Sequence, residues 1–348
     1  MADGVVAAGD DSMKIVVTGG CGFIGSHVAE HLREVFPGAR LTILDKLTYT
    51  GDMDNVSHLV TGNGNGKGVH LVVGDICDAD LCRRVVRNAD LVVHLAAESF
   101  VDNSFGDPLT FTITNTLGTH MLLEACRIAE VPRVIHVSTD EVYGEVLRGR
   151  VGEDAPFNPT NPYSASKAAA EMIILGYLRS YRQPIIRVRA NNIFGIRQYP
   201  EKVIPKFCLS LFLGAKLTIH GNGSHRRHYL HAQDFAAAIA LLIDKGVAGE
   251  VYNVGSEEEY STLQVAEMVC DVFGKSCSEE IVFVKDRLFN DRRYSISSAR
   301  MQSLGWRAQR HLADELGSIA QWYTDRVERY RHLFVDAPAS PQEALICA

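Results

Sequence analysis

A glycine-rich turn between an apolar stretch and an amphipathic stretch most constrains how this chain can fold. KIVVTGG (14–20) is rich in β-branched residues and predicts a strand, while SHVAEHLREVF (26–36) has the spacing of a helix. Between them, Gly20, Gly22 and Gly25 match G-x-G-x-x-G, whereas Gly19, Gly22 and Gly25 fit G-x-x-G-x-x-G. In either register the glycines permit a tight turn, close approach of a pyrophosphate to the backbone, and close packing of the helix.

The second predicted strand, RLTILD (40–45), ends in Asp45, which stands twenty residues after Gly25 of the glycine turn. A carboxylate at this place accepts hydrogen bonds from the ribose of an adenine dinucleotide and repels a 2′-phosphate. Asp45 therefore favours NAD over NADP, although the neighbouring Lys46 argues the other way. The alternative interpretation is a glycine-rich turn of an α/β protein that binds no dinucleotide.

Predicted strands and helices alternate along the first 195 residues. Further strands are predicted at 69–75, 90–97, 133–139 and 184–195, and helices at 81–88 and 110–130. This order predicts an α/β fold, a Rossmann-type doubly wound parallel sheet, followed by a smaller C-terminal substrate-binding lobe. Amphipathic helices are expected there at 262–274 and 313–334.

The pattern also predicts where the domains divide. We expect a flexible tail at 1–12, an NAD-binding Rossmann domain at 13–190 to which 228–258 returns, and a tail at 336–348. The substrate-binding lobe is then formed by 191–227 and 259–335. TGNGNGKG (61–68) predicts a flexible surface loop.

The composition argues against several classes of function. With 35 basic and 42 acidic residues, a net charge of -7 and no long basic run, nucleic-acid binding has little electrostatic support. No stretch can span a bilayer and the first residues lack the regions of a signal peptide, so a cytoplasmic location is expected. The 8 cysteines form no CxxC pair or zinc-type cluster, so we expect reduced thiols and no metal.

STDEVYG (138–144) places Asp140 and Glu141 side by side after a predicted buried strand. Burying adjacent like charges is costly, so the ordinary interpretation is a solvated turn. Ligands of open α/β sheets, however, bind at the carboxyl ends of strands, where this pair stands. Two carboxylates in one dry pocket do not ionise together easily, so the pair can divide into an acid and a base.

NPYSASKAAAEMII (161–174) predicts a helix on which Tyr163 and Lys167 share one face, because they are four residues apart. A free tyrosine has a pKa of about 10, and a nearby ammonium group together with a positive nicotinamide ring favours its phenolate. Alone, such a pair is usually an ordinary helix surface. Behind a dinucleotide-binding fold it indicates a base for a sugar hydroxyl.

Together, the glycine turn, Ser138-Thr139 and the Tyr163/Lys167 pair resemble the extended short-chain dehydrogenase/reductase family over residues 14–325. Within it, the chain resembles the nucleotide-sugar 4,6-dehydratases in DKLTYTGD, HLAAESFVDNS, STDEVYGE, NPYSASKAAAE, QYPEKVIPKF and DRLFNDRRY. The resemblance implies a lyase with tightly bound, recycled NAD. It implies oxidation of a nucleotide-linked hexose at C4, elimination of water across C5 and C6, and return of the hydride to C6.

The resemblance also assigns roles to single residues. It makes Tyr163 with Lys167 the pair that removes the hydroxyl proton, Thr139 a partner of the C4 oxygen, Asp140 the acid and Glu141 the base. The residues it assigns to the cofactor are Gly19, Gly22, Phe23, Ile24, Gly25, Asp45, Lys46, Thr48, Asp75, Ile76, Leu95, Ala96, Ala97, Ser99, Thr114, Tyr163 and Lys167. Those it assigns to the nucleotide-sugar are Ser99, Thr139, Asn192, Lys202, Val203, Arg227, Arg287 and Asn290.

Several of these assignments leave alternatives open. Arginines suit a diphosphate, and we expect the histidines near Arg227 (225, 228 and 231) to form a solvated loop rather than a metal site. Asn192 is aligned with the sugar contact in preference to Asn191. Family members commonly dimerise through helices at about 106–129 and 162–181, so a homodimer is implied by analogy.

The substrate and the activity are also open at this stage. Phe289-Asn290 resembles plant and viral UDP-glucose dehydratases more than the Gly-His pair of bacterial dTDP-glucose dehydratases, which favours UDP-glucose. A rhamnose route for the product is a guess. The alternatives are a 4-epimerase or decarboxylase on the same fold and a non-catalytic NAD-binding regulator. The Asp-Glu pair argues against the former, and the Tyr/Lys pair argues against the latter.

Overall fold

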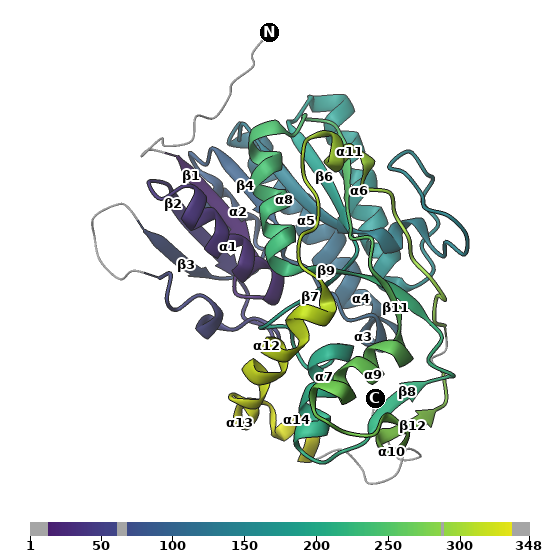
Figure 1. Cartoon of the computed structure of the whole chain (residues 1–348). Coiled ribbons are helices and arrows are strands. Elements are labelled where there is room, and N and C mark those ends of the chain that lie inside the picture. The colour runs from purple at the N-terminus through teal and green to yellow at the C-terminus, as the bar shows by residue number, and fades with distance from the viewer. Residues whose placement is uncertain (1–12, 61–67, 287–288, 336–348) are drawn as a thin grey trace.

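The centre of the molecule is a seven-stranded, all-parallel sheet (Figure 1). The computed structural model describes residues 13–60, 68–286 and 289–335, so both predicted tails and most of the 61–68 loop lie outside the described residues. The strands, in the order β10-β6-β5-β4-β1-β2-β3, are Val251–Val254, Ile185–Ala190, Val134–Thr139, Leu91–His94, Lys14–Thr18, Arg40–Asp45 and Val69–Val73. An order of 3-2-1-4-5-6 is that of the Rossmann fold, so the predicted doubly wound sheet is confirmed.

Helices cover both faces of this sheet, as the continuous apolar strands predict. Because side chains alternate along a strand, Ile15 and Val17 of β1 join one buried cluster and Val16 joins another. The first cluster includes α1 (Phe23–Val35) and α8 (Ala232–Lys245). The second includes α2 (Ala79–Val86), α5 (Thr119–Ile128) and α6 (Pro162–Tyr181). Each face of the sheet therefore has its own apolar core.

The helix predicted at 110–130 is present but irregular. It consists of α4 (Pro108–Phe111), a π-helical segment η2 (Thr112–Gly118) and α5. Short elements precede it, namely the 3-10 turn η1 (Met53–Asn55) and α3 (Val101–Gly106). Such π-helical segments are frequent at functional sites.

The remaining elements build a smaller lobe around its own buried cluster. Two small sheets are formed there, β11-β9-β7 (Glu259–Ser261, Arg226–His231, Asn192–Phe194) and β12-β8 (Ile281–Val284, Leu217–His220). The helices are α7 (Val203–Phe212), α9 (Thr262–Val272), α10 (Cys277–Glu280), α12 (Leu312–Thr324), α13 (Val327–Tyr330) and α14 (His332–Val335). One segment returns to the main sheet, since α11 (Ala299–Ser303) and Trp306 join the first cluster. The domain boundaries given above stay a prediction.

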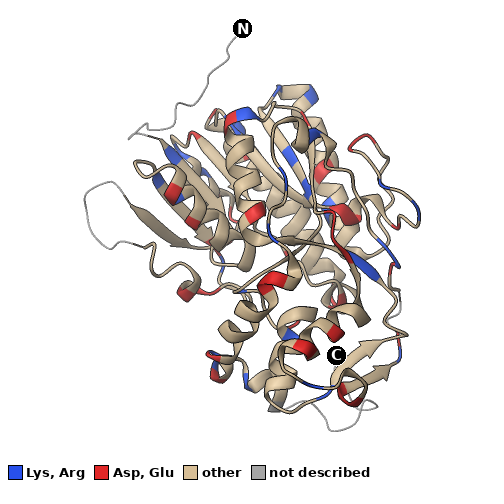
Figure 2. Ribbon diagram, in the orientation of Figure 1, with Lys and Arg blue, Asp and Glu red and all other residues tan. Residues whose placement is uncertain are grey.

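The helix predicted at 313–334 is wrong in one respect, because α12 ends before Asp325 and Arg326 adopts a non-helical backbone. The break turns Val327 and Tyr330 back onto Tyr323 in the buried cluster of the lobe. Acidic and basic residues are interspersed over the ribbon (Figure 2). No helix of the described ranges is long and apolar enough to cross a membrane.

The structure shows which glycines the first turn requires. Gly19 has a φ of +70°, and a Cβ there would lie 2.7 Å from the backbone nitrogen of Ala96. A Cβ on Gly25 would lie 2.0 Å from the carbonyl oxygen of Gly19. By contrast, the three atoms nearest to a Cβ on Gly20 all belong to the side chain of Ile43. The tight turn therefore depends on Gly19 and Gly25.

We expect Gly25→Ala to lower the free energy of unfolding by about 1–3 kcal/mol, because the added methyl group forces the turn backbone apart. The matched control is Gly317→Ala in the exposed middle of α12, where a Cβ meets nothing within 4 Å. That change should stabilise the chain by about 0.5–1 kcal/mol. Urea unfolding of the three proteins checks both values, and equal midpoints for Gly25→Ala and the unaltered chain would contradict the account.

Candidate active site

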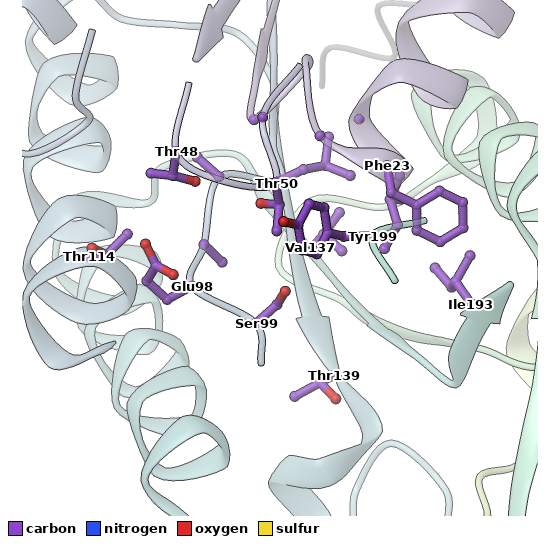
Figure 3. Close-up of a pocket in the computed structure, with 18 of the residues that line it drawn as sticks. Phe23, Thr48, Thr50, Glu98, Ser99, Thr114, Val137, Thr139, Ile193 and Tyr199 are labelled. Atoms are coloured by element: carbon purple, nitrogen blue, oxygen red, sulfur yellow. The ribbon is translucent and has the colours of Figure 1, made fainter. Parts of the chain in front are cut away.

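One pocket opens at the carboxyl ends of the central strands, where parallel sheets bind their ligands. All residues predicted for catalysis and for the cofactor line it, together with Asn192 and Lys202 from the predicted substrate set. Figure 3 shows Thr139 at the end of its strand below Ser99, with Glu98 and Thr114 to one side and Phe23 and Ile193 to the other. The structure therefore brings these segments together, while the role of each residue stays a prediction.

The first part of the pocket has the features of a dinucleotide site. Gly22 caps α1 without a side-chain hydrogen bond, and the first turn of that helix carries no acidic residue. Its backbone N–H groups can therefore bind an anion. Asp45 accepts hydrogen bonds from the backbone nitrogens of Cys21 and Leu47, each at 2.8 Å, and a carboxylate retains lone pairs for a ribose. These residues fit NAD.

Lys46, which argued for NADP, is occupied by a neighbouring carboxylate. Its Nζ lies 2.7 Å from Oδ2 of Asp75. This ion pair raises the pKa of Lys46 and lowers that of Asp75, although burial of the carboxyl acts in the opposite direction. A lysine held in this way is less suited to receive a 2′-phosphate.

The start of α6 positions the tyrosine and the lysine. Asn161 caps the helix by accepting a hydrogen bond from the backbone nitrogen of Ser164 at 2.8 Å, and the Ser164 hydroxyl accepts one in return from the nitrogen of Asn161 at 3.1 Å. Pro162 stands at the first helical position. One turn later, Nζ of Lys167 donates to the carbonyl oxygen of Val137 at 2.8 Å.

The electrostatics of this pair differ from the expectation. Burial lowers the pKa of Lys167 to about 8. Burial and then the charge of Glu141 raise the pKa of Tyr163, and these effects outweigh the hydrogen bond from Thr139. In the protein alone burial therefore dominates, and the expectation that the ammonium group and a bound nicotinamide ring together favour the phenolate stays a prediction.

The 3-10 turn η3 (Asp140–Tyr143) places the two carboxylates inside the pocket. Thr139 caps this turn, since its Oγ1 accepts a hydrogen bond from the backbone nitrogen of Glu141 at 3.2 Å. Asp140 is 3% exposed, and its Oδ2 accepts a hydrogen bond from Nδ2 of Asn191 at 2.7 Å. Burial, reinforced by the charge of Glu141, raises the pKa of Asp140 to about 7. The interpretation as a solvated turn is therefore wrong.

Glu141 has a different set of partners. Its Oε2 accepts a hydrogen bond from Nδ2 of Asn161 at 3.2 Å and lies 3.4 Å from the Tyr294 hydroxyl. Burial raises the pKa of Glu141, whereas Asn161, Arg227 and Lys202 oppose that shift. Asp140 therefore keeps a proton near neutral pH, whereas Glu141 has hydrogen-bond donors and cations around its carboxyl. This arrangement suits an acid and a base.

Three of the described residues that were predicted to bind the substrate, Val203, Arg227 and Asn290, do not line the pocket. Arg227 stacks on the Tyr294 ring at 4.5 Å and lowers the pKa of both Asp140 and Glu141. Asn290 donates to Asp286 at 2.9 Å, and Val203 begins α7. Arg287 lies outside the described residues. In the described ranges, no group of three or more His, Cys, Asp or Glu could hold a metal ion.

The sequence analysis missed the residues that hold the two carboxylates. They are Asn191, which was set aside in favour of Asn192, and Asn161 and Tyr294. Asn161 and Tyr294 stood within quoted motifs, NPYSASKAAAE and DRLFNDRRY, but no local pattern showed which side chain they would meet.

Comparisons with known proteins agree with this geometry. A trifunctional UDP-glucose 4,6-dehydratase/3,5-epimerase/reductase of Arabidopsis thaliana is 43% identical over 321 residues. That match covers 90% of this chain but 48% of the relative, so the chain spans about half the length of this curated relative. A dTDP-D-glucose 4,6-dehydratase of Mus musculus is 38% identical over 331 residues, covering 93% of this chain and 92% of the relative.

The solved structures include a dTDP-glucose 4,6-dehydratase of Streptomyces venezuelae with NAD bound. It has a TM-score of 0.88 and 37% identity to this chain, and the match covers 92% of this chain and 100% of that one. The family model described as GDP-mannose 4,6 dehydratase matches residues 16–317. The predicted membership of the extended short-chain dehydrogenase/reductases is thus confirmed, and the chain belongs to the GDP-mannose 4,6 dehydratase family within them.

Proposed function

We propose that this protein is an NAD-dependent NDP-glucose 4,6-dehydratase, a lyase that acts on UDP-glucose or dTDP-glucose. The product is the corresponding NDP-4-keto-6-deoxy-glucose, formed with loss of water. The observation that carries this proposal is the pair of the buried Asp140 and the half-buried Glu141, which lines one pocket with Tyr163. An enzyme that only moves a hydride has no evident use for a second acid-base pair.

The residues that would hold NAD are those of the glycine turn and the ends of β2 and β4. Backbone N–H groups at the start of α1 suit its pyrophosphate, and Asp45 suits its adenosine ribose. When bound, NAD accepts a hydride from C4 and returns it to C6, and its positive ring favours ionisation of nearby acids.

The first task of the protein side chains is to accept the proton of the C4 hydroxyl. Tyr163, as the phenolate that the positive ring of bound NAD would favour, takes this proton, and Thr139 is the partner of the C4 oxygen beside it. Lys167, fixed on the carbonyl of Val137 one turn along α6, supplies a positive charge. Oxidation at C4 gives a ketone, which makes the hydrogen on C5 acidic.

The carboxylate pair then eliminates water. Glu141 in its ionised form removes the proton from C5, and Asp140 in its protonated form donates a proton to the C6 hydroxyl, which leaves as water. With a pKa of about 7, about half of the Asp140 carboxyl groups are protonated at neutral pH. The electron pair of the C5–H bond becomes the C5–C6 double bond, so charge and atoms balance.

Of the two candidate nucleotides, UDP-glucose is the one we favour. The Phe289-Asn290 pair supports it, since it resembles the corresponding residues of plant UDP-glucose dehydratases. Phe289 is 47% exposed and Asn290 donates to Asp286, and both lie at the surface of the lobe.

Incubation with UDP-glucose or dTDP-glucose in heavy water tests the function. We expect mass spectrometry to show loss of water and uptake of deuterium at C5, because Glu141 exchanges its proton with solvent. Faster turnover of UDP-glucose would support the nucleotide preference. An unchanged sugar mass would indicate an epimerase, and loss of carbon dioxide from a glucuronate substrate would indicate a decarboxylase.

Tyr163→Phe is the matching variant for this experiment. Loss of a positioned general base should reduce turnover by about 10²–10⁴-fold while NAD binding is retained. Tyr260→Phe is the control, because that hydroxyl bonds Glu258 and lies away from the pocket. Full activity of Tyr163→Phe would refute the assignment of the base.

The pKa of Asp140 gives a second prediction. Because Asp140 acts as an acid, kcat should fall as pH rises through about 7. In Asp140→Asn this decrease of kcat should disappear, together with most of the turnover.

The same pKa predicts how stability depends on pH. A carboxyl whose folded pKa is raised stabilises the fold less as pH rises from about 4 to 7. The melting temperature of Asp140→Asn should therefore exceed that of the unaltered chain at pH 8 and not at pH 4.

We also infer that the protein is a homodimer that pairs through the helices at 106–129 and 162–181. Large exposed apolar residues on them support this interface, namely Leu109, Ile113, Leu117, Ile128, Met172 and Tyr181. Light scattering should give twice the chain mass of 38.3 kDa, and Leu117→Glu should halve it. A monomeric unaltered chain at micromolar concentration would remove this inference.

A further inference from the structure

Besides Asp140, the site has another buried carboxylate, whose charge acts on Glu141. Asp291 is 2% exposed, and its Oδ2 accepts hydrogen bonds from Oγ1 of Thr160 at 2.6 Å and from the Tyr294 hydroxyl. Its Oδ1 is buried and has no hydrogen-bond partner among the described residues. Burying a charge with one oxygen unpaired is costly, and no step proposed above uses this group.

The Tyr294 hydroxyl joins this carboxylate to the elimination base. Its oxygen lies 3.4 Å from Oε2 of Glu141, and its ring is 4% exposed under the stacked guanidinium of Arg227. The backbone beside it is fixed as well, because the carbonyl oxygen of Arg293 accepts a hydrogen bond from the nitrogen of Val146 at 2.9 Å. The hydroxyl is therefore held between two acids.

The geometry decides which way this hydroxyl acts. A phenolic hydroxyl has one proton to donate, and the contact with Asp291 is the closer of its two contacts. With the proton directed to Asp291, the Tyr294 oxygen presents a lone pair to Glu141. Glu141 can donate a hydrogen bond to that lone pair when its carboxyl is protonated. The negative charge of Asp291 also favours the protonated form of Glu141.

The other groups around Glu141 act with different signs. Asp291 raises the pKa of Glu141, whereas Arg227 and Lys202 lower it together with the amide of Asn161. Tyr163 of α6 and the adjacent Asp140 also face it. Asp291, in the C-terminal segment, is thus a negative group that raises the pKa of Glu141.

We propose that Asp291 is a positioning residue that acts through Tyr294 to keep Glu141 a strong base directed at the substrate. This inference rests on the proposed function, in which Glu141 removes the C5 proton. It explains why Asp291 is retained in a buried place with an unpaired oxygen. It also makes the arrangement of the base depend on the segment that carries Asn290, one of the residues predicted to bind the nucleotide-sugar.

An infrared titration tests this without turnover. The band of the protonated Glu141 carboxyl is isolated by subtracting Glu141→Gln, and its midpoint is followed with pH. In Asp291→Asn the midpoint should move to lower pH by about one unit, since a negative neighbour is lost. Tyr294→Phe, which removes the linking oxygen, should move it in the same direction and provides a second variant if Asp291→Asn does not fold.

The pH dependence of kcat gives the matching kinetic readout. The acidic limb should move to lower pH in Asp291→Asn, and kcat on the plateau should fall about three- to tenfold, because a weaker base transfers the proton more slowly. KM should change less than kcat. The double variant Asp291→Asn/Tyr294→Phe should behave as either single variant, since both act on one path.

Asp234→Asn is the control for loss of a buried aspartate. Asp234 is 7% exposed and accepts hydrogen bonds from the backbone nitrogens of Gln309 and Arg310, away from the pocket. It should lower the melting temperature without moving the Glu141 midpoint. An unmoved midpoint in both Asp291→Asn and Tyr294→Phe overturns the inference, whereas a moved midpoint in a protein that forms no dehydrated sugar overturns only the proposed function.

Discussion

The placement of two adjacent carboxyl groups at the end of β5, Asp140 buried and Glu141 half-buried, is the constraint on which the site depends. The last residues of a parallel strand that is buried on both faces lie where ligands bind. Amides from two other segments reach Asp140 and Glu141 there and offset the cost of placing them together. The separate environments of the two carboxyls then follow from which donors each one receives.

The central sheet could be predicted from the sequence because its signals are local. A run such as KIVVT, followed by glycines and a helical pattern, specifies strand, turn and helix within about twenty residues. The smaller lobe could be predicted only in part. Its strands are three to six residues long, and the break in the helical pattern at Asp325 depends on packing against Tyr323, which no local pattern reports.

The candidate site shows the same division. The residues of the glycine turn, the Asp-Glu pair and the Tyr/Lys pair stand in short motifs, so their types and spacing indicate their chemistry. Their partners are distant in the chain: Asn191 lies 51 positions from Asp140, and Tyr294 lies 153 positions from Glu141. The effect of burial on the pKa of Tyr163 could not be predicted either, since burial is a property of the folded chain and cannot be read from a four-residue spacing.

The cap of α6 has a consequence for how this site can vary. Asn161 uses its oxygen to begin the helix and its nitrogen to hold Glu141. Serine or aspartate would serve the helix equally well, but neither offers an N–H to the carboxylate, and aspartate would bring one more negative charge. Among the common helix-capping side chains, only asparagine meets both demands. Helix-capping preference alone would allow several residues at position 161. Because one amide both starts α6 and orients Glu141, we expect other capping residues to be tolerated poorly there.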